Sequence, residues 1–316
     1  MVKTRTEKVA NALPPWSAPS AGQLGSLARS FDRSLRATNR SESTRQQYLM
    51  SVSQFITFLH NAGIPEDPAK LGREHVETFL ADFAASHAPA TVQTRYKCLR
   101  LFFSYLLEES EISTHPMANM KPPQVPAVPV PVLDPVQLAS LLDTCKGKSF
   151  EERRDNAALR LFIDTGMRRG ELAGLRVDDI DFETDVAVVV GKGRRPRVCP
   201  FGARTGQALD RYLRERGRRP DGALPWLWLG RKGRLTDSGF LQMVKRRGRE
   251  AGLGEVHPHQ LRHSFAHDWL AQGGQEGELM RLAGWGSRQM LQRYAASAGD
   301  ERARASHRRM GLGDRL

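Results

Sequence analysis

The sequence predicts a mainly α-helical protein with a small antiparallel β-sheet, of the α+β class. Four amphipathic stripes precede residue 113, prolines crowd the next segment, and a later stretch alternates β-branched residues between turn residues. We therefore expect a flexible segment over residues 1–19, a four-helix domain over 20–113, a linker over 114–131 and a second domain over 132–316.

In the first domain, apolar residues recur every three or four positions, which is the spacing of one helix face. The stripes run over 24–35, 48–59, 76–83 and 92–106, and an SES cluster before the second is typical of a helix N-cap. If each stripe packs against the others, the basic residues stay outside: Arg36, Arg40, Arg45, Arg95, Lys97 and Arg100. These are either a solvated surface or contacts to phosphates.

The segment between the domains contains six prolines from Pro116 to Pro131. Proline lacks a backbone N–H and cannot propagate a helix, so such a segment tends to be extended and semi-rigid. This composition predicts an interdomain linker.

The second domain begins at Asp134-Pro135, an N-cap residue followed by proline at the first helical position. A helix over about 152–165 is expected to end at Gly166 in a left-handed cap, which leaves Arg168 in a tight turn. Three short antiparallel strands follow within DIDFETDVAVVVGKGRRPRVCP, then a helix over 203–217, a buried WLWLG segment, a helix from Thr236 to about Ala251 and a short basic helix over 300–310.

The 316-residue chain has 48 Lys and Arg against 35 Asp and Glu, a net charge of +13. Such an excess favours a polyanionic partner. Nucleic acid fits better than a membrane, because no stretch approaches the roughly 18 consecutive apolar residues of a spanning helix. The amino terminus lacks the apolar run of a secretory signal. Cys98, Cys145 and Cys199 are too far apart for a disulfide framework or a C-x-x-C zinc site, so a reducing cytoplasm is the simplest setting. With a nucleic-acid partner, we expect a cytoplasmic protein associated with the bacterial nucleoid.

The stretch HPHQLRHSFAHDWLAQGGQEGELMRLAGWGSRQMLQRY, residues 257–294, carries the candidate chemistry. His259 and Arg262 lie three residues apart, so both are expected on one helix face. Trp285 follows a glycine turn. Tyr294 is followed by AASAG rather than by further core residues, whereas the other tyrosines lie on apolar helix stripes.

The pattern H-x-x-R, a G-W turn and a tyrosine nine residues later resembles the tyrosine recombinase (phage integrase) family. TGMRRGEL, with Arg168 and Glu171, and GKGRRPR, with Lys192, occupy the expected upstream places. The resemblance covers residue 132 to about 300 well and 20–113 in general character, and it implies an N-terminal DNA-binding domain of the SAM-like type before a catalytic domain.

The resemblance implies that Tyr294 attacks the DNA phosphate to form a 3′-phosphotyrosyl bond. Arg168 and Arg262 would clamp the non-bridging oxygens, since guanidinium offers paired donors that match phosphate. Lys192 would protonate the leaving 5′-oxygen, and His259 would exchange a proton with the tyrosine. Many members have histidine at the position of Trp285 and others have tryptophan, whose indole N–H can donate a hydrogen bond to a phosphate oxygen but cannot accept a proton. Glu171 and His263 would support the site.

Several alternatives stay open at this point. Arg168 could simply pair with Glu171, Lys192 could be one more phosphate-neutralising charge, and Trp285 could only pack. His259, His263 and His267 recur every four residues, which invites a metal site, although no carboxylate or cysteine cluster accompanies them. Further DNA contacts are expected from a set of basic residues: Arg45, Arg95, Lys97, Arg194, Arg195, Lys245 and Arg246. For the helix that carries Lys245 and Arg246, a plain solvated surface is the alternative.

The function expected is therefore a site-specific DNA recombinase that needs no metal, nucleotide or other cofactor. The family implies a homotetramer on two DNA sites, with an accessory DNA-bending or directionality factor as a further partner. A type IB topoisomerase and a catalytically idle DNA-binding protein are the alternatives.

Overall fold

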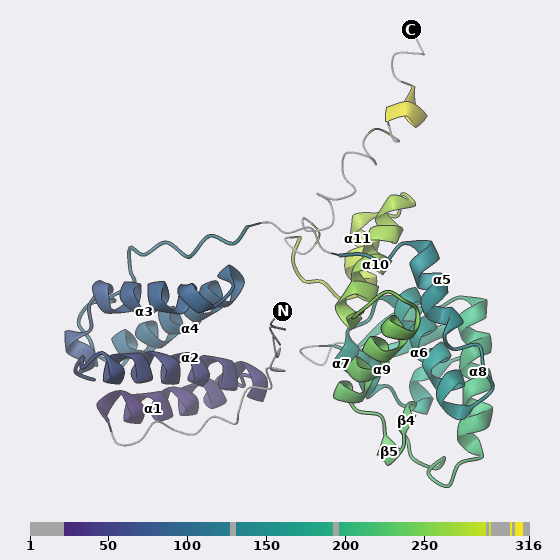
Figure 1. Cartoon of the computed structure of the whole chain (residues 1–316), viewed down its shortest axis with the longest axis horizontal. Coiled ribbons are helices and arrows are strands. Elements are labelled where there is room, and N and C mark those ends of the chain that lie inside the picture. Colours follow the sequence, from purple (N-terminus) through teal and green to yellow (C-terminus); the bar gives the residue numbers. More distant parts are fainter. Residues whose placement is uncertain are drawn as a thin grey trace, which may run out of the picture. The chain divides into compact units, whose positions relative to one another are not determined.

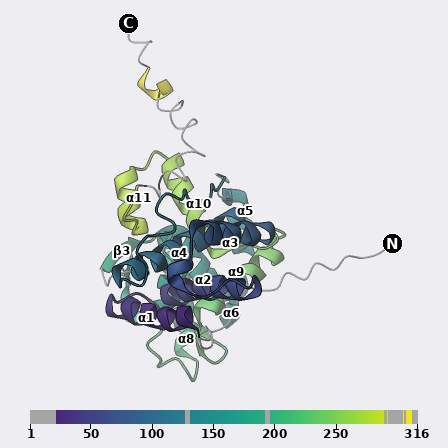
Figure 2. The same cartoon turned by 90° about the vertical axis from the view of Figure 1, so that its left-hand side faces the viewer.

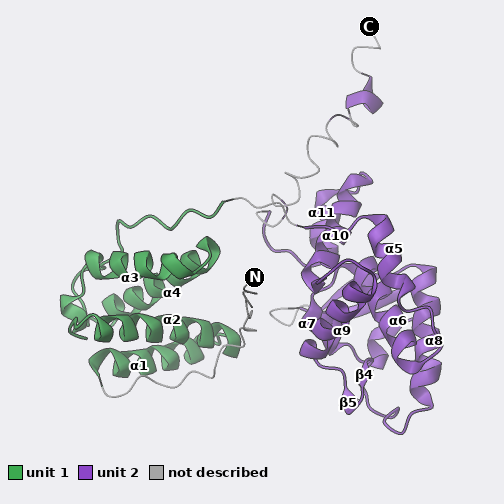
Figure 3. Cartoon of the chain, in the orientation of Figure 1, with its two compact units in different colours: residues 1–127 green, residues 128–316 purple. Residues whose placement is uncertain are grey.

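The computed structural model describes residues 22–126, 131–191, 196–288, 291, 304 and 307–311. The chain forms two compact units, Met1–Ala127 and Val128–Leu316, which Figure 3 distinguishes by colour. Among the described residues, no helix is long and apolar enough to span a membrane.

The first unit is a bundle of four α-helices that lie side by side in both views (Figures 1 and 2). Their amphipathic faces meet in one core around Phe55, Leu99 and Phe103, as the stripes predict. Ser41 caps the second helix by accepting a hydrogen bond from the Thr44 backbone N–H at 3.3 Å. The elements are α1 (Gln23–Ala37), α2 (Glu42–Asn61), the 3-10 turn η1 (Pro68–Lys70), α3 (Arg73–Ser86) and α4 (Pro89–Glu108).

The beginning of the expected linker packs onto this bundle instead of running free. Met117 and Met120 are buried in the core of the first unit. The Tyr96 hydroxyl donates to the Met120 carbonyl at 2.5 Å, and the Gln93 amide donates to the Pro123 carbonyl at 3.1 Å. The two methionines supply apolar anchors that the proline count alone does not reveal.

The second unit is mixed. Its described elements are α5 (Pro135–Asp143), α6 (Phe150–Thr165), α7 (Arg169–Gly174), η2 (Val177–Asp179), β1 (Ile180–Asp181), β2 (Val186–Val190), β3 (Pro196–Pro200), α8 (Ala203–Gly217), β4 (Leu229–Gly230), β5 (Gly233–Arg234), α9 (Asp237–Glu250), α10 (Pro258–Ala271) and α11 (Glu276–Ala283). This confirms the predicted α+β class with a small antiparallel sheet.

The three strands predicted in the β-branched stretch form an antiparallel sheet in the order β1-β2-β3. Ile180 pairs with Ala187, and Val188 pairs with Val198. Because side chains alternate across a strand, Ala187 and Val189 face the core while Val188 and Val190 are exposed. α7, α6 and α11 all contact this sheet, so the sheet links the helices that carry the candidate site.

The WLWLG segment contributes Leu227 and Trp228 to the core of the second unit, and residues 227–230 are buried as predicted, while Trp226 is partly exposed. Trp228 stacks on Tyr212, with ring centroids 5.3 Å apart, and its indole N–H donates to the Leu172 carbonyl at 2.9 Å. The Tyr212 hydroxyl donates to the Leu227 carbonyl at 2.9 Å. Burial raises the pKa of Tyr212 to about 12, which fits a structural tyrosine.

The predicted stop at Gly166 is confirmed. Gly166 ends α6 with a φ of 54°, in the left-handed region. A Cβ atom there would come within 2.2 Å of the Phe265 ring, so α10 packs directly over the turn. Because Gly166 has no side chain, the turn after α6 lies close to α10, and so does Arg168 two positions later.

Candidate active site

A cavity of about 360 Å³ in the second unit contains three of the residues expected from the sequence. Arg168, His259 and Arg262 lie on its wall, although more than 90 residues separate the first from the other two. The full lining is Phe162, Arg168, Arg169, Gly170, Asp237, Leu241, His257, Pro258, His259 and Arg262.

Arg168 lies immediately before α7, and its side chain is fixed at both ends of the guanidinium. One nitrogen donates to Glu171 at 2.9 Å, and another donates to the Gly284 carbonyl at 2.7 Å. Its backbone N–H also donates to Glu171, at 2.7 Å. The side chain remains 41% exposed, so a ligand in the cavity can reach it.

Arg262 projects from the first turns of α10 and is only 5% exposed. It donates to the Gly166 carbonyl and, at 2.7 Å, to the Ala283 carbonyl. Its guanidinium lies over the Trp285 ring, 5.4 Å from the centroid, where the face of the indole attracts a cation. Neutral carbonyl oxygens and a ring therefore orient this charge.

Three successive carbonyls at the end of α11 accept hydrogen bonds from three arginines. Leu282 accepts from Arg197 at 2.9 Å, Ala283 from Arg262, and Gly284 from Arg168. The last carbonyls of a helix have no partner within the helix and carry partial negative charge, so cations stabilise this end. The arginines thus anchor the chain just before Trp285.

Glu171 ties two of these arginines together. Its carboxylate accepts hydrogen bonds from two guanidinium nitrogens of Arg197, at 2.8 and 2.6 Å, as well as the hydrogen bonds from Arg168. Burial alone would raise the pKa of this carboxyl, but the hydrogen bonds and charge of Arg197 and Arg168 outweigh it and lower the pKa to about 2. Glu171 is therefore ionised at neutral pH, and the group of three carries one net positive charge.

His259 and His263 project one helical turn apart on α10, with ring centroids 6.0 Å apart. Partial burial is the main cause that lowers the pKa of His259, and the positive charges of Arg262, Arg169 and His257 lower it further. The neutral imidazole is thereby favoured, and a neutral imidazole can accept a proton. Within the part of the chain that the structure describes, no group of three His, Cys, Asp or Glu side chains is arranged to hold a metal ion.

Lys192, Arg194, Arg195 and Tyr294 lie outside the described residues, as does most of the helix expected over 300–310. Their roles stay predictions. The described hairpin strands β2 and β3 end at Val190 and begin at Pro196 on either side of Lys192.

The expectation that Arg95 lies on the outer surface of the first unit is wrong. It is 7% exposed, donates to the Ser51 hydroxyl at 3.2 Å and lies 5.4 Å from the centroid of the Phe83 ring. Arg95 lies on the buried face of α4, because that face includes more positions than those occupied by the apolar residues. Burial lowers its pKa.

The other tentative DNA contacts that the structure describes differ in their pairing. Arg45 is 11% exposed at its side chain and pairs with Asp32 at 2.7 Å. Lys245 pairs with Glu255 at 3.1 Å, and Arg246 pairs with the buried Asp155 at 2.6 Å while 39% of its side chain stays exposed. Lys97 is exposed and donates a hydrogen bond to Gln93 at 2.8 Å.

Two further arginines support the site and are not predicted from the sequence: Arg197 and Arg169. Arg197 lies in the same GKGRRPR stretch as Lys192, and its side chain is 12% exposed. The alternation of β3 gives a signal, because Arg197 and Cys199 share the inward face. Arg169 holds Asp237 at the N-terminus of α9, with Nε to carboxylate at 2.7 Å, and so joins two walls of the cavity.

The fold and the cavity together define a class: a two-unit protein whose mixed unit gathers two arginines and a histidine suited to a phosphate ester. Two family models match the chain, the phage integrase family over residues 131–301 and the phage integrase N-terminal SAM-like domain over 27–112. The chain belongs to the phage integrase family of tyrosine recombinases. The resemblance and the domain types expected from the sequence are confirmed.

Curated relatives agree with this assignment. The chain is 30% identical over 251 residues to the tyrosine recombinase XerD of Listeria innocua, covering 77% of this chain and 84% of that protein. It is 34% identical over 258 residues to the tyrosine recombinase XerC of Chromohalobacter salexigens, covering 80% and 85%.

Solved structures share the fold. One is the XerH site-specific recombinase bound to palindromic difH substrate in a post-cleavage complex, with a TM-score of 0.72 and 19% identity over 89% of this chain and 83% of that chain. Another is the Tn1549 transposon integrase with a circular intermediate DNA, with a TM-score of 0.71 and 20% identity over 90% and 99%.

Proposed function

We propose that the cavity lined by Arg168, His259 and Arg262 receives the scissile phosphate of a DNA duplex and that Tyr294 attacks it. As a tyrosine recombinase, the chain cuts and rejoins DNA strands at specific sites. The main support is that one small cavity is lined by two fixed guanidinium groups and by the imidazole of His259, whose lowered pKa favours the neutral form. Simple DNA binding requires no such collection.

The two arginines neutralise the non-bridging oxygens as negative charge develops on the phosphate. Both are held by backbone carbonyls at the end of α11, so they are oriented before DNA arrives. Groups that need no reorganisation during the reaction stabilise a transition state most effectively. Glu171 and Arg197 support this arrangement through Arg168 rather than by touching the phosphate.

The chemistry balances without a cofactor. The phenol oxygen of Tyr294 forms a bond to phosphorus, the bond from phosphorus to the 5′-oxygen breaks, and the phenol proton passes to His259. Lys192 supplies the proton that the departing 5′-oxygen takes up. In the second step another 5′-hydroxyl attacks the phosphotyrosyl ester, and the protons move in the opposite direction.

Trp285 serves this site through its indole N–H, which can donate a hydrogen bond to a phosphate oxygen, and through packing. It is 6% exposed and its ring lies against the Arg262 guanidinium. An indole cannot accept a proton, so it takes no acid–base role. It keeps Arg262 aimed and excludes water from one side of the guanidinium.

The partner of this site is double-stranded DNA, which the net charge of +13 favours. The similar XerH recombinase is bound to a palindromic difH substrate, and the similar Tn1549 transposon integrase is in complex with a circular intermediate DNA. The assembly proposed is a homotetramer on two DNA sites, aided by a DNA-bending or directionality factor, in the cytoplasm at the nucleoid.

A trapping assay with nicked duplexes tests the proposal. The duplexes come from DNA beside the gene, and the nick lets a short 5′-hydroxyl fragment diffuse away, so a covalent adduct accumulates. Wild type should form an adduct that survives denaturing gels, while Tyr294→Phe should bind the same duplex and form none. Tyr212→Phe is the control for removing a hydroxyl elsewhere. Adduct formation by Tyr294→Phe contradicts the proposal, and relaxation of supercoiled DNA without strand exchange points to a topoisomerase.

A further inference from the structure

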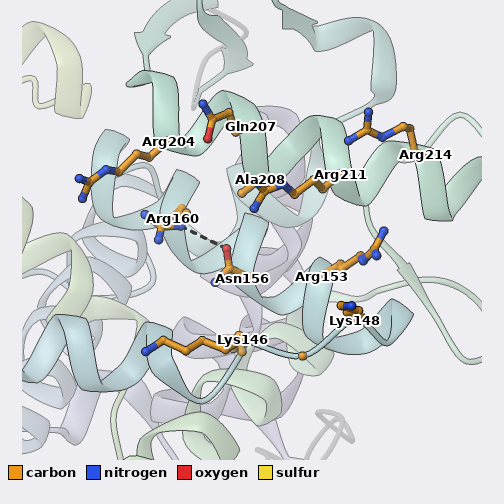
Figure 4. Close-up of a pocket in the computed structure, with 12 residues that line it drawn as sticks. Lys146, Lys148, Arg153, Asn156, Arg160, Arg204, Gln207, Ala208, Arg211 and Arg214 are labelled. Carbon is orange, nitrogen blue, oxygen red and sulfur yellow. Dashed lines mark hydrogen bonds between the residues drawn. The ribbon is translucent and has the colours of Figure 1, made fainter.

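A second pocket in the same unit, of about 630 Å³, is lined by twelve residues, of which seven are basic. Figure 4 shows it between α6 and α8, with the loop that carries Lys146 and Lys148 along one side. Seven cations line it: Lys146, Lys148, Arg153, Arg160, Arg204, Arg211 and Arg214. The lining contains neither a carboxylate nor an aromatic ring.

The positive charge of this pocket is only partly compensated. Carboxylates just outside the lining pair with three of the cations: Glu215 with Arg153, Asp210 with Arg214 and Asp143 with Lys146. Within the described part of the chain, the other four have no carboxylate partner: Lys148, Arg160, Arg204 and Arg211. By contrast, Arg154, Arg246 and Arg247 nearby all pair with Asp155.

The pocket is separate from the candidate active site. The two share no lining residue, and α6 packs between α8 and α10. In Figure 1, α8 lies on the far side of α6 from α7 and α9, which line the active-site cavity. A ligand held here therefore does not occupy the active-site cavity.

The spacing of the cations follows two helical stripes. α8 presents Arg204, Gln207, Arg211 and Arg214 at intervals of three or four residues, and α6 presents Arg153, Asn156 and Arg160. The stripe on α8 extends over about 15 Å at 1.5 Å per residue. Over that length one DNA strand places about four phosphates, since each strand carries one charge per roughly 3.4 Å of helix axis.

We propose that this pocket binds the phosphate backbone of a second segment of duplex DNA, beyond the segment at the active site. Guanidinium groups on two facing helices match a row of phosphates. A single-stranded nucleic acid would be expected to meet aromatic side chains for base stacking, and the lining has none. A protein partner would be expected to find an apolar anchor, and the lining offers only Ala208 and the buried Cys145.

The first test compares two double variants of the full chain that remove the same charge. Arg204→Gln/Arg211→Gln changes the pocket, and Arg231→Gln/Lys232→Gln changes the turn between β4 and β5. All four side chains are exposed, so the fold should survive, which circular dichroism checks. Binding to a duplex of about 60 base pairs is measured over a range of salt concentrations. The slope of log K against log salt should fall by about two for the pocket variant, because each lost phosphate contact removes about 0.9. The control slope should stay near wild type.

The second test places a photo-crosslinking amino acid at Gln207, which lies between Arg204 and Arg211 on the stripe. A matched chain carries it at Val136, an exposed residue of α5. Illumination with labelled duplex should attach DNA at position 207 and not at 136. Equal slopes for the two double variants, together with no crosslink at 207, would overturn the proposal. Crosslinking at 207 to a poly-glutamate peptide but not to duplex would overturn it too and assign an acidic protein partner.

Discussion

Glu171 and Arg197 form an ion pair inside the second unit, joined by two parallel hydrogen bonds of 2.8 and 2.6 Å. Both side chains are nearly buried, at 7% and 12% exposure. Arg197 also donates to the Leu282 carbonyl, and Glu171 also holds Arg168. One ion pair thus connects the sheet, the start of α7 and the end of α11, which are the elements that fix the arginines of the candidate active site.

Replacing Arg197 by methionine should destabilise the protein by about 3 kcal/mol, because it leaves a buried carboxylate without its main partner. Chemical denaturation measures this. The control is Arg218→Met, which removes an ion pair whose arginine is 74% exposed and should change stability by less than about 0.5 kcal/mol. Equal losses of stability in the two variants would show that the buried ion pair stabilises the fold no more than the exposed one.

The ionisation of Glu171 should make stability depend on pH in acid. Its pKa is about 2 in the folded protein and near 4.5 as the ordinary value. A lowered folded pKa stabilises the fold fully above pH 4.5, and this contribution disappears as the pH falls toward 2. The shift corresponds to about 3 kcal/mol.

Glu171→Gln should therefore be less stable than wild type at neutral pH, and the difference should shrink between pH 4.5 and 2. Unfolding by denaturant at several pH values measures it. Asp210→Asn, which removes an exposed carboxylate, serves as the control. A difference between Glu171→Gln and wild type that stays constant over this range would refute the ionisation account.

Gly284→Ala should weaken both the fold and the reaction. Gly284 has a φ of 64°, and a Cβ atom there would lie 3.0 Å from the Arg197 guanidinium. Gly273→Ala is the matched control, since Gly273 has a φ of 85° and nothing within 4 Å of the added carbon. Both should lose about 1 kcal/mol from backbone strain. Only Gly284→Ala should also slow adduct formation with nicked DNA, because it displaces the arginines.

The pH dependence of cleavage should report His259. Its pKa is lowered by burial and by neighbouring positive charge, so the neutral form that accepts the tyrosine proton predominates at neutral pH. Single-turnover adduct formation should fall as acid protonates this imidazole. His259→Gln should be slower by about a hundredfold and should lose that acid limb. His267→Gln should keep the wild-type profile; an unchanged profile in His259→Gln would remove His259 from the proton path.

The sequence predicts the fold well where local signals and packing agree. The helical stripes, the left-handed cap at Gly166 and the three strands are confirmed because spacing, glycine conformation and alternation act over a few residues. Arg95 was misplaced because a buried arginine is stabilised by partners far along the chain, Ser51 and Phe83. Arg197 was missed for the same reason, since its importance comes from Glu171 and from the carbonyl of Leu282. Spacing brings His259 and Arg262 together, but only the tertiary structure places Arg168 beside them.

The most direct test of the account identifies the amino acid that carries the DNA. Wild-type adduct formed on a nicked duplex is digested with protease and nuclease, and the nucleotide-linked peptide is sequenced by mass spectrometry. If Tyr294 is the nucleophile, this peptide carries a tyrosine ester to a 3′-phosphate on Tyr294. A nucleotide on any other residue, or a 5′-phosphate linkage, would contradict it.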